Sequence, residues 1–261
     1  VIEYGILNAD YAMFQKGFSL GLINDTKGKI DVLTALIQKY PSSTYVPNAI
    51  FERGRAYLVL EEFKKGESDF NTIISDYPGS SFVPRSIVQL GLLYYNIGEN
   101  EKAISQYKKV IGTYKSTPEA RDALTGLRNS YVDLNDVDAY FTYAKTLDGY
   151  GDINLAQKDS MLYISGENLF MSGKYDKATE VLKNYINEFP HGSFRQNAQY
   201  YLAECLKSAG NVDEALKLYI EVSGEPNNQF LEQSLIAASS ILYEKEEFSS
   251  SLDYFEKLEK V

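Results

Sequence analysis

The sequence predicts an all-helical protein, an α-solenoid of about seven helix-turn-helix repeats with a period near 37 residues. Three observations predict this fold. A small residue recurs at this spacing, as Gly17, Gly54, Gly91, Gly166, Ala203 and Ser239. A second small residue follows in the next helix, as Ala103, Ala178, Ala215 and Ser251. A large apolar residue comes four positions later, as Leu33, Phe70, Tyr107, Leu182, Tyr219 and Phe255.

The spacing has a physical reason. Small residues let two antiparallel helices approach closely, and the large residues fill the remaining gap. One pair of helices cannot bury its own apolar face, so the pairs stack and share a continuous core. The expected repeats cover approximately residues 8–44, 45–81, 82–118, 119–156, 157–193, 194–229 and 230–261.

The linkers between repeats are also similar to one another. Three repeats close with an aromatic residue and proline, as Tyr40-Pro41, Tyr77-Pro78 and Phe189-Pro190. After these, Thr44, Ser81 and Ser193 are the expected N-caps of the next first helix. Pro47 and Pro84 fall in the first turn, where a missing N–H costs nothing. We expect the surplus residues of the long period to lengthen each first helix by about one turn.

The fourth repeat is degenerate, because Arg128 and Tyr140 stand where the other repeats carry small residues. An array of stacked repeats opens first where an interface is poorest, so this repeat is the expected weak point. Since a solenoid grows in length with repeat number, we expect residues 1–261 to form a single solenoid domain. The missing polar cap at the C-terminal end indicates a fragment of a longer protein.

The pattern of small, Tyr, Gly, Ala, aromatic and Pro residues resembles the tetratricopeptide repeat (TPR) family over essentially the whole chain. It is clearest in Gly54-x-x-Tyr57 and Gly91-x-x-Tyr94. The long period and the Tyr/Phe-Pro-x-Ser linkers are similar to those of bacterial envelope TPR proteins, of the β-barrel assembly lipoprotein and Tol-Pal coordinator type. This resemblance implies a protein of the periplasm or the outer membrane.

The resemblance also implies a binding groove lined by the first helices. Transfer of the family's groove positions by register gives Tyr11, Phe14, Phe18, Phe51, Arg55, Arg85, Tyr95, Asn129, Tyr163, Glu167, Phe170, Tyr200, Glu204 and Tyr243. Such a groove is aromatic, with basic residues in the N-terminal repeats and acidic residues in the C-terminal repeats. Aromatic and arginine side chains dominate binding energies, so a partner peptide or helix is expected there. Some of these rings are expected instead to pack against neighbouring helices.

Composition argues against an enzyme. With one cysteine, Cys205, and one histidine, His191, no Cys/His metal cluster and no disulfide can form. Cys205 is expected to be a small buried apolar residue, and His191 an ordinary linker residue. The sequence has no glycine-rich phosphate loop, and we expect no catalytic residue, no cofactor and no metal.

Charge is spread unevenly along the chain. Residues 1–130 carry 15 basic and 14 acidic side chains, whereas residues 131–261 carry 11 and 22. An acidic half disfavours binding to nucleic acid. The sequence also lacks an apolar run near 18 residues, so we expect no direct membrane insertion.

Two functions remain open. One is a structural scaffold in a bacterial envelope complex, which predicts stable protein partners. The other is a cytoplasmic adaptor or regulator that binds one partner peptide reversibly. The oligomeric state and the identity of the partner do not follow from the sequence.

Overall fold

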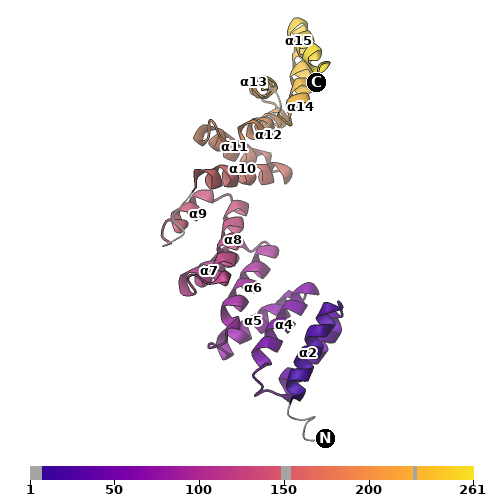
Figure 1. Ribbon diagram of the computed structural model, residues 1–261. Coiled ribbons are helices and arrows are strands. Elements are labelled where there is room, and N and C mark those ends of the chain that lie inside the picture. Colours follow the sequence, from indigo (N-terminus) through magenta and orange to yellow (C-terminus); the bar gives the residue numbers. More distant parts are fainter. Residues whose placement is uncertain (1–7, 148–153, 226–227) are drawn as a thin grey trace. The chain divides into compact units, whose positions relative to one another are not determined.

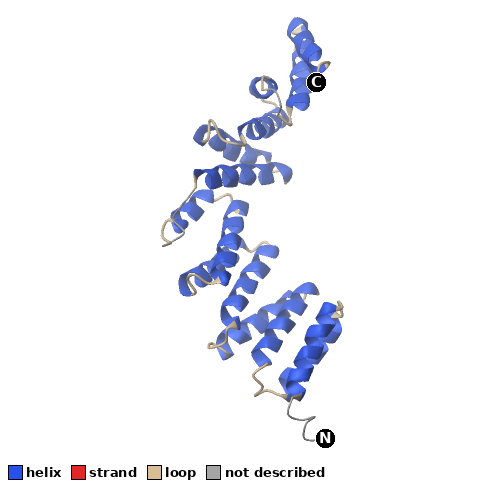
Figure 2. Ribbon diagram, in the orientation of Figure 1, coloured by secondary structure: helices blue, strands red, loops and turns tan. Residues whose placement is uncertain are grey.

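The computed structural model describes residues 8–147, 154–225 and 228–261, and none of these residues forms a strand. They form fourteen helices in seven successive pairs (Figures 1 and 2). The first helices are α2 (Ala9–Leu22), α4 (Val46–Val59), α6 (Phe82–Asn96), α8 (Pro118–Asp133), α10 (Leu155–Met171), α12 (Arg195–Ser208) and α14 (Leu231–Glu244). The second helices are α3 (Thr26–Lys39), α5 (Phe63–Asp76), α7 (Asn100–Thr113), α9 (Val137–Ala144), α11 (Tyr175–Glu188), α13 (Val212–Ser223) and α15 (Phe248–Leu258). The all-helical solenoid prediction is therefore confirmed.

Contacts divide the chain into two compact units, an N-terminal unit, Val1–Ser130, and a C-terminal unit, Tyr131–Val261. Within the N-terminal unit each helix from α2 to α7 packs on the next one along the chain. Within the C-terminal unit the same holds from α10 to α15. The prediction of a single domain stays a prediction.

The small residues of the first helices lie where two helices approach closely, as the pattern predicts. A Cβ atom on Gly17 would lie 2.7 Å from Leu33, and one on Gly91 would lie 2.5 Å from the Tyr107 ring. Real Cβ atoms do not approach other atoms so closely. The large partners, Leu33 and Tyr107, are at most 2% exposed. These glycines therefore allow two helices of one repeat to close on a buried side chain.

The linkers differ from the prediction. Helix α4 begins at Val46 with Tyr45 as its N-cap residue, and α12 has Phe194, so the assignments of Thr44 and Ser193 were wrong. Ser81 does occupy the N-cap position of α6, but its side chain makes no capping hydrogen bond. The preceding serines bind the linker backbone instead. Ser43 Oγ accepts from the Tyr45 N–H, and Ser80 Oγ accepts from the Phe82 N–H, both at 3.2 Å.

A first helix that is longer by about a turn is seen in the fifth repeat, where α10 has 17 residues and α11 has 14, but not in the second repeat. Helices α4 and α5 both contain 14 residues, so the surplus of this repeat does not lie in its first helix. It lies in the turns that precede the helix, where Ser43 N–H donates to Tyr40 and Val46 N–H donates to Ser43. This places an aromatic residue, Tyr45, directly before α4.

The fourth repeat is short, since α9 has only eight residues. Arg128 is exposed, whereas Tyr140 is buried. The close approach in α8 is made by Gly126, where a Cβ would lie 2.3 Å from the Tyr107 ring of the preceding repeat. Gly126 therefore closes α8 on the preceding repeat, whereas Gly17 and Gly91 close their helices on the second helix of their own repeat.

Candidate functional site

Five of the predicted groove residues lie together in the N-terminal unit, around one pocket. Phe14 and Phe18 come from α2, Phe51 and Arg55 from α4, and Arg85 from α6. The pocket has a volume of about 330 Å³, and its other lining residues are Gln15, Asn48, Glu52 and Phe82. We call it the Phe18 pocket. Its size is at the lower end of the range for ligand sites, which fits one large side chain of a partner.

The rings of the Phe18 pocket differ in how much surface they offer. Phe14 stacks on Tyr45 of the next linker, with ring centroids 5.5 Å apart and planes 19° from parallel. Phe51 packs against Phe82 at 5.0 Å and is only 6% exposed. Phe18 is 44% exposed. Phe18 is therefore the ring with most surface left for a partner, and Phe51 is mainly core.

Two guanidinium groups lie at the rim of this pocket. Arg55 pairs with Glu52 on its own helix at 3.2 Å, and Arg85 pairs with Glu119 of α8 at 3.1 Å. Both arginine side chains remain more than half exposed. Hydrogen bonds from its own backbone and from Arg85 lower the pKa of Glu119, against the opposing effect of burial. The carboxylates of the two pairs are largely covered, since the Glu52 side chain is 13% and the Glu119 side chain 18% exposed, so solvent reaches each pair mainly at the arginine.

A common contact explains why several predicted groove rings are not free. A ring on a first helix packs on an aromatic residue that lies at the start of the next first helix or directly before it. The four pairs are Phe14 with Tyr45, Phe51 with Phe82, Tyr163 with Phe194, and Tyr200 with Phe230. The last two are nearly parallel, at 4.6 and 4.1 Å. We call these contacts junction stacks, since each joins two successive repeats.

Tyr45, Phe82, Phe194 and Phe230 were not among the predicted groove residues. The sequence did carry a signal for three of them, because Tyr45, Phe82 and Phe194 occupy the same place in the aligned linkers. What the alignment could not show was which first-helix ring each would meet. Gln15, Asn48 and Glu52 of the Phe18 pocket were missed as well, since polar residues on a helix surface carry no distinctive pattern.

The acidic groove residues of the C-terminal unit satisfy tyrosine hydroxyls. Tyr163 donates to Glu167, and Tyr219 donates to Glu204, both at 2.6 Å. Burial first, and then the neighbouring carboxylate, raises the pKa of both tyrosines. For Tyr200, burial and Glu204 raise the pKa to about 12. Each carboxylate thus has one oxygen engaged by the protein itself.

The remaining predicted residues differ in how far they are exposed. Tyr11 is 44% and Tyr243 is 60% exposed, and Tyr163 is 4% exposed. Phe170 is half-buried and packs on Tyr201, with centroids 4.7 Å apart. Tyr95 and Asn129 are half-buried.

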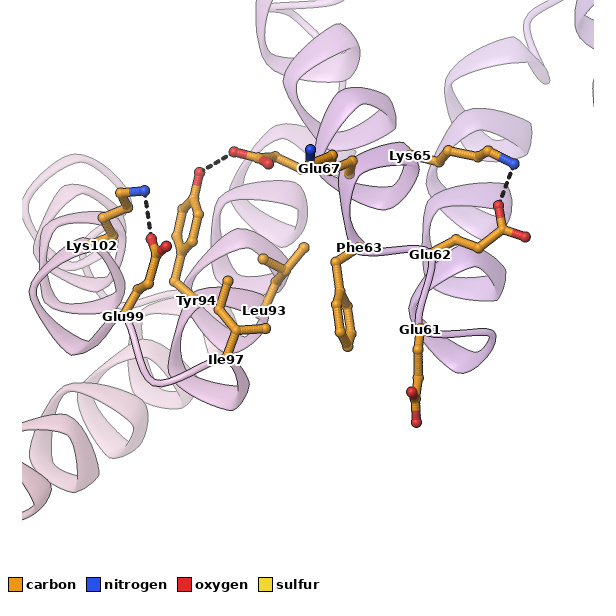
Figure 3. A pocket seen from close by; sticks show the side chains of 11 residues that line it. Glu61, Glu62, Phe63, Lys65, Glu67, Leu93, Tyr94, Ile97, Glu99 and Lys102 are labelled. Carbon is orange, nitrogen blue, oxygen red and sulfur yellow. Dashed lines mark hydrogen bonds and ion pairs between the residues drawn. The ribbon is translucent and has the colours of Figure 1, made fainter.

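A larger pocket lies at the turns of the second and third repeats, and we call it the turn pocket (Figure 3). Its volume is about 610 Å³. Phe63 from the start of α5 and Leu93 and Ile97 from the end of α6 form its apolar lining. The Glu62–Lys65 and Glu99–Lys102 ion pairs flank it on two sides. No residue of the turn pocket was predicted as a site residue.

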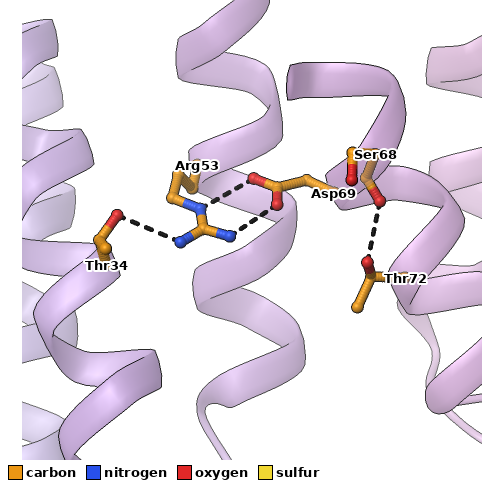
Figure 4. Close-up of polar contacts among 5 residues, drawn as sticks. All are labelled: Thr34, Arg53, Ser68, Asp69 and Thr72. Atoms are coloured by element: carbon orange, nitrogen blue, oxygen red, sulfur yellow. Dashed lines mark hydrogen bonds and ion pairs between the residues drawn. The ribbon is translucent and has the colours of Figure 1, made fainter. Parts of the chain in front are cut away.

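One buried charged cluster is structural. The Arg53 guanidinium donates to both carboxylate oxygens of Asp69, at 2.6 and 2.9 Å, and to Thr34 Oγ1 at 3.1 Å (Figure 4). Arg53 thereby ties α4 to α5 within its own repeat and to α3 of the preceding one. Because every charge in it is satisfied by another part of the fold, this cluster is not a binding site.

No metal-binding group of three or more His, Cys, Asp or Glu side chains is formed by the described part of the chain. Cys205 is buried, as predicted, and burial raises the pKa of its thiol to about 11, so it is protonated at neutral pH. His191 is exposed in its linker. Over the residues that the structure places, no helix is both long and apolar enough to cross a membrane.

The fold defines a class, the helical repeat proteins built from stacked pairs of helices. Models of the tetratricopeptide repeat match residues 11–43 and 85–117 in one version and residues 169–238 in another. These matches together cover just over half of the chain. The chain belongs to the tetratricopeptide repeat family. Members of this family generally mediate protein–protein interactions and are generally not enzymes.

One solved structure supports the fold, and two others are similar over most of their length. A tetratricopeptide repeat protein from Parabacteroides merdae is 16% identical, with 97% of this chain and 93% of that chain covered and a TM-score of 0.50. The TPR2AB domain of yeast Sti1, solved in complex with pHSP90, is 16% identical, with 95% and 89% covered and a TM-score of 0.44. Pseudomonas aeruginosa PilF is 15% identical, with 87% and 96% covered and a TM-score of 0.44. At 16% identity the likeness to the Parabacteroides merdae protein shows the fold alone. The comparison with curated proteins found no match.

Proposed function

We propose that this protein is a non-enzymatic scaffold whose first helices bind a peptide or helix of a protein partner. The observation that carries the proposal is the Phe18 pocket. It gathers Phe14, Phe18 and Phe51 with Arg55 and Arg85 from three successive first helices. The pocket accepts an aliphatic or aromatic side chain of the partner, and an acidic group beside it binds the two arginines.

The groove residues of the C-terminal unit belong to the same proposal. Tyr243 offers exposed aromatic surface, and Glu167 and Glu204 are each held in place by a tyrosine hydroxyl. A carboxylate held in this way needs no further ordering when a polar group of the partner arrives. Tyr163 supports Glu167 rather than contacting the partner, because its ring is buried.

We further propose that the scaffold works in a bacterial envelope complex. The support is the recurrence of the aromatic-Pro linkers, at Tyr40-Pro41, Tyr77-Pro78 and Phe189-Pro190, together with the long period. The alternative is a cytoplasmic adaptor that binds one peptide reversibly. The following experiment distinguishes the two functions.

The test is affinity capture from separated soluble and envelope fractions of the native organism. The bait is compared with a Phe18→Ser, Arg55→Ala variant, in which both side chains are well exposed and the core is left intact. The matched control is Leu252→Ser, which removes from a second helix an apolar side chain that is 57% exposed, against 44% for Phe18. Equal helicity of the three baits by circular dichroism checks that folding is preserved.

We expect envelope proteins that bind the native chain and the Leu252→Ser control but are lost with the double variant. Capture of one soluble partner with the same dependence would replace the envelope scaffold by the adaptor. Equal capture by all three baits would contradict the binding role of the Phe18 pocket.

A further inference from the structure

The turn pocket lies away from the proposed groove, at the ends of α4 and α6 where each first helix turns into the second. It shares no lining residue with the Phe18 pocket. Its volume of about 610 Å³ is in the middle of the range for sites that bind ligands or side chains. In Figure 3 the side chains of Phe63, Leu93 and Ile97 lie beside one opening.

The apolar lining is accessible from solvent. Leu93 is buried at the base and Phe63 is half-buried, while Ile97 is 40% exposed. Exposed apolar surface inside a pocket is the part that a partner can cover with a gain in free energy, because water leaves both surfaces. The lining therefore fits an aliphatic or aromatic side chain.

The same three residue types flank the pocket on both sides. Tyr57, Glu62 and Lys65 recur as Tyr94, Glu99 and Lys102, 37 residues later. In each set the lysine pairs with the glutamate and lies over the tyrosine ring, at 5.3 Å for Tyr57 and 5.4 Å for Tyr94. Each of these two lysines is paired with a glutamate of its own turn, and the lining as a whole carries four glutamates against three lysines.

Two other carboxylates of the pocket, Glu61 and Glu67, form no ion pair within the described part of the chain, although the charge of Glu67 contributes to raising the pKa of Lys102. Glu67 accepts the Tyr94 hydroxyl at 2.5 Å. Burial and Glu67 raise the pKa of Tyr94 to about 12, which keeps this hydroxyl protonated as a donor. Glu61 lies at the edge of the opening, away from the ion pairs (Figure 3). Among the described residues neither Glu61 nor Glu67 forms an ion pair, and the one lining lysine without a partner is Lys64.

We propose that the turn pocket is a second docking site, for a protein segment in which an aliphatic or aromatic side chain stands next to a lysine or arginine. The apolar side chain covers Phe63, Leu93 and Ile97. The cation pairs with Glu67, whose second oxygen is free of the tyrosine hydroxyl, or with Glu61. The site differs in charge from the Phe18 pocket, where the rim carries arginines. Two segments of opposite charge can therefore bind to the same unit.

The test uses the whole chain, labelled with nitrogen-15, and two blocked tetrapeptides, Gly-Leu-Arg-Gly and Gly-Leu-Glu-Gly. Each is titrated while the backbone amide signals are followed by nuclear magnetic resonance. We expect the arginine peptide to shift signals of residues 61–67 and 93–102, and the glutamate peptide to leave them in place. The Glu67→Gln variant keeps an acceptor for the Tyr94 hydroxyl. Its dissociation constant for the arginine peptide should be about two- to fivefold higher than that of the native chain.

Ile97→Ser should weaken binding of the arginine peptide as well. The control is Ile236→Ser, which changes a similarly exposed isoleucine of the C-terminal unit and should leave this binding unchanged. Equal binding of both peptides, or shifts confined to the Phe18 pocket, would overturn the proposal. So would the absence of shifts at the highest soluble peptide concentration. Shifts in the same residues on concentrating the chain alone would assign the pocket to a second copy and also overturn it. Because the two pockets share no residue, either proposal can fail while the other stands.

Discussion

The junction between the second and third repeats and the junction between the third and fourth are built differently. The first is closed by a junction stack, Phe51 on Phe82. At the next junction, one repeat of 37 residues later, Val88 stands in the place of Phe51 and Glu119 in the place of Phe82. No ring stack can form there, and Arg85 and Glu119 form an ion pair instead. Arg85 also lies over the Phe82 ring at 5.4 Å, so it touches both junctions.

The difference concerns how each junction is stabilised. A buried stack gains free energy from removing apolar surface from water, which salt does not screen. A half-exposed ion pair contributes little and is screened by salt. The junction stacks return at Tyr163–Phe194 and Tyr200–Phe230. By this comparison we infer that the junction of the third repeat with the short fourth one is the weaker type, and the weakness expected of the fourth repeat stays a prediction.

The largest effect is expected at the stacked junction. Phe51→Ala should lower the free energy of unfolding by about 3–5 kcal/mol, because it leaves a cavity among buried rings. Urea unfolding followed by circular dichroism measures this. The control is Phe18→Ala, which removes a ring that is 44% exposed and should cost about 0.5 kcal/mol or less. Similar losses for both variants would show that Phe51 is not a junction residue.

A smaller effect is expected inside a repeat. Gly91→Ala places a Cβ 2.5 Å from the ring of Tyr107, which is only 2% exposed and has no room to move. Overpacking of this kind should cost about 1–3 kcal/mol. Gly112→Ala is the matched control, because nothing lies within 4 Å of its Cβ, and it should be neutral or stabilising by up to about 1 kcal/mol. A stable Gly91→Ala protein would mean that the helices of the repeat can separate freely.

The comparison can be sharpened by building the missing stack. Val88→Phe together with Glu119→Phe recreates the two ring positions of the other junctions. In a double-mutant cycle the two rings should favour each other by about 0.5–1.5 kcal/mol, the usual coupling of an aromatic pair. Thermal unfolding of the four proteins in the cycle gives this energy. A coupling near zero would show that ring identity at these positions is not what closes a junction.

The smallest effect is expected for the ion pair itself. Arg85→Ala should cost less than about 1 kcal/mol, and the cost should shrink as salt is added. The pKa of Glu119 is lowered in the folded protein, so its contribution is present above the unfolded value of about 4.3 and is lost as pH falls through the folded value. Urea unfolding between neutral and acid pH should show a smaller loss for Arg85→Ala than for the native chain. An unchanged pH dependence would remove Arg85 from the causes of the Glu119 shift.

Sequence reasoning located part of the candidate site. It named Phe14, Phe18, Phe51, Arg55 and Arg85, all of which line the Phe18 pocket. It did not separate exposed rings from buried ones, because Phe18 and Phe51 are the same residue type on equivalent helices. It also missed Phe82, which closes both the pocket and the junction stack.

The sequence by itself determined the helix pairs and the contacts within a repeat. Gly91 and Tyr107 lie in adjacent helices joined by a short turn, so their spacing along the chain fixes their meeting in space. The tertiary structure alone decided what happens between repeats. The meeting of Phe51 with Phe82 depends on how one pair stacks on the next, and so does the turn pocket between α5 and α6. Burial of a side chain is set by whichever neighbour covers it, and the local pattern does not contain that neighbour.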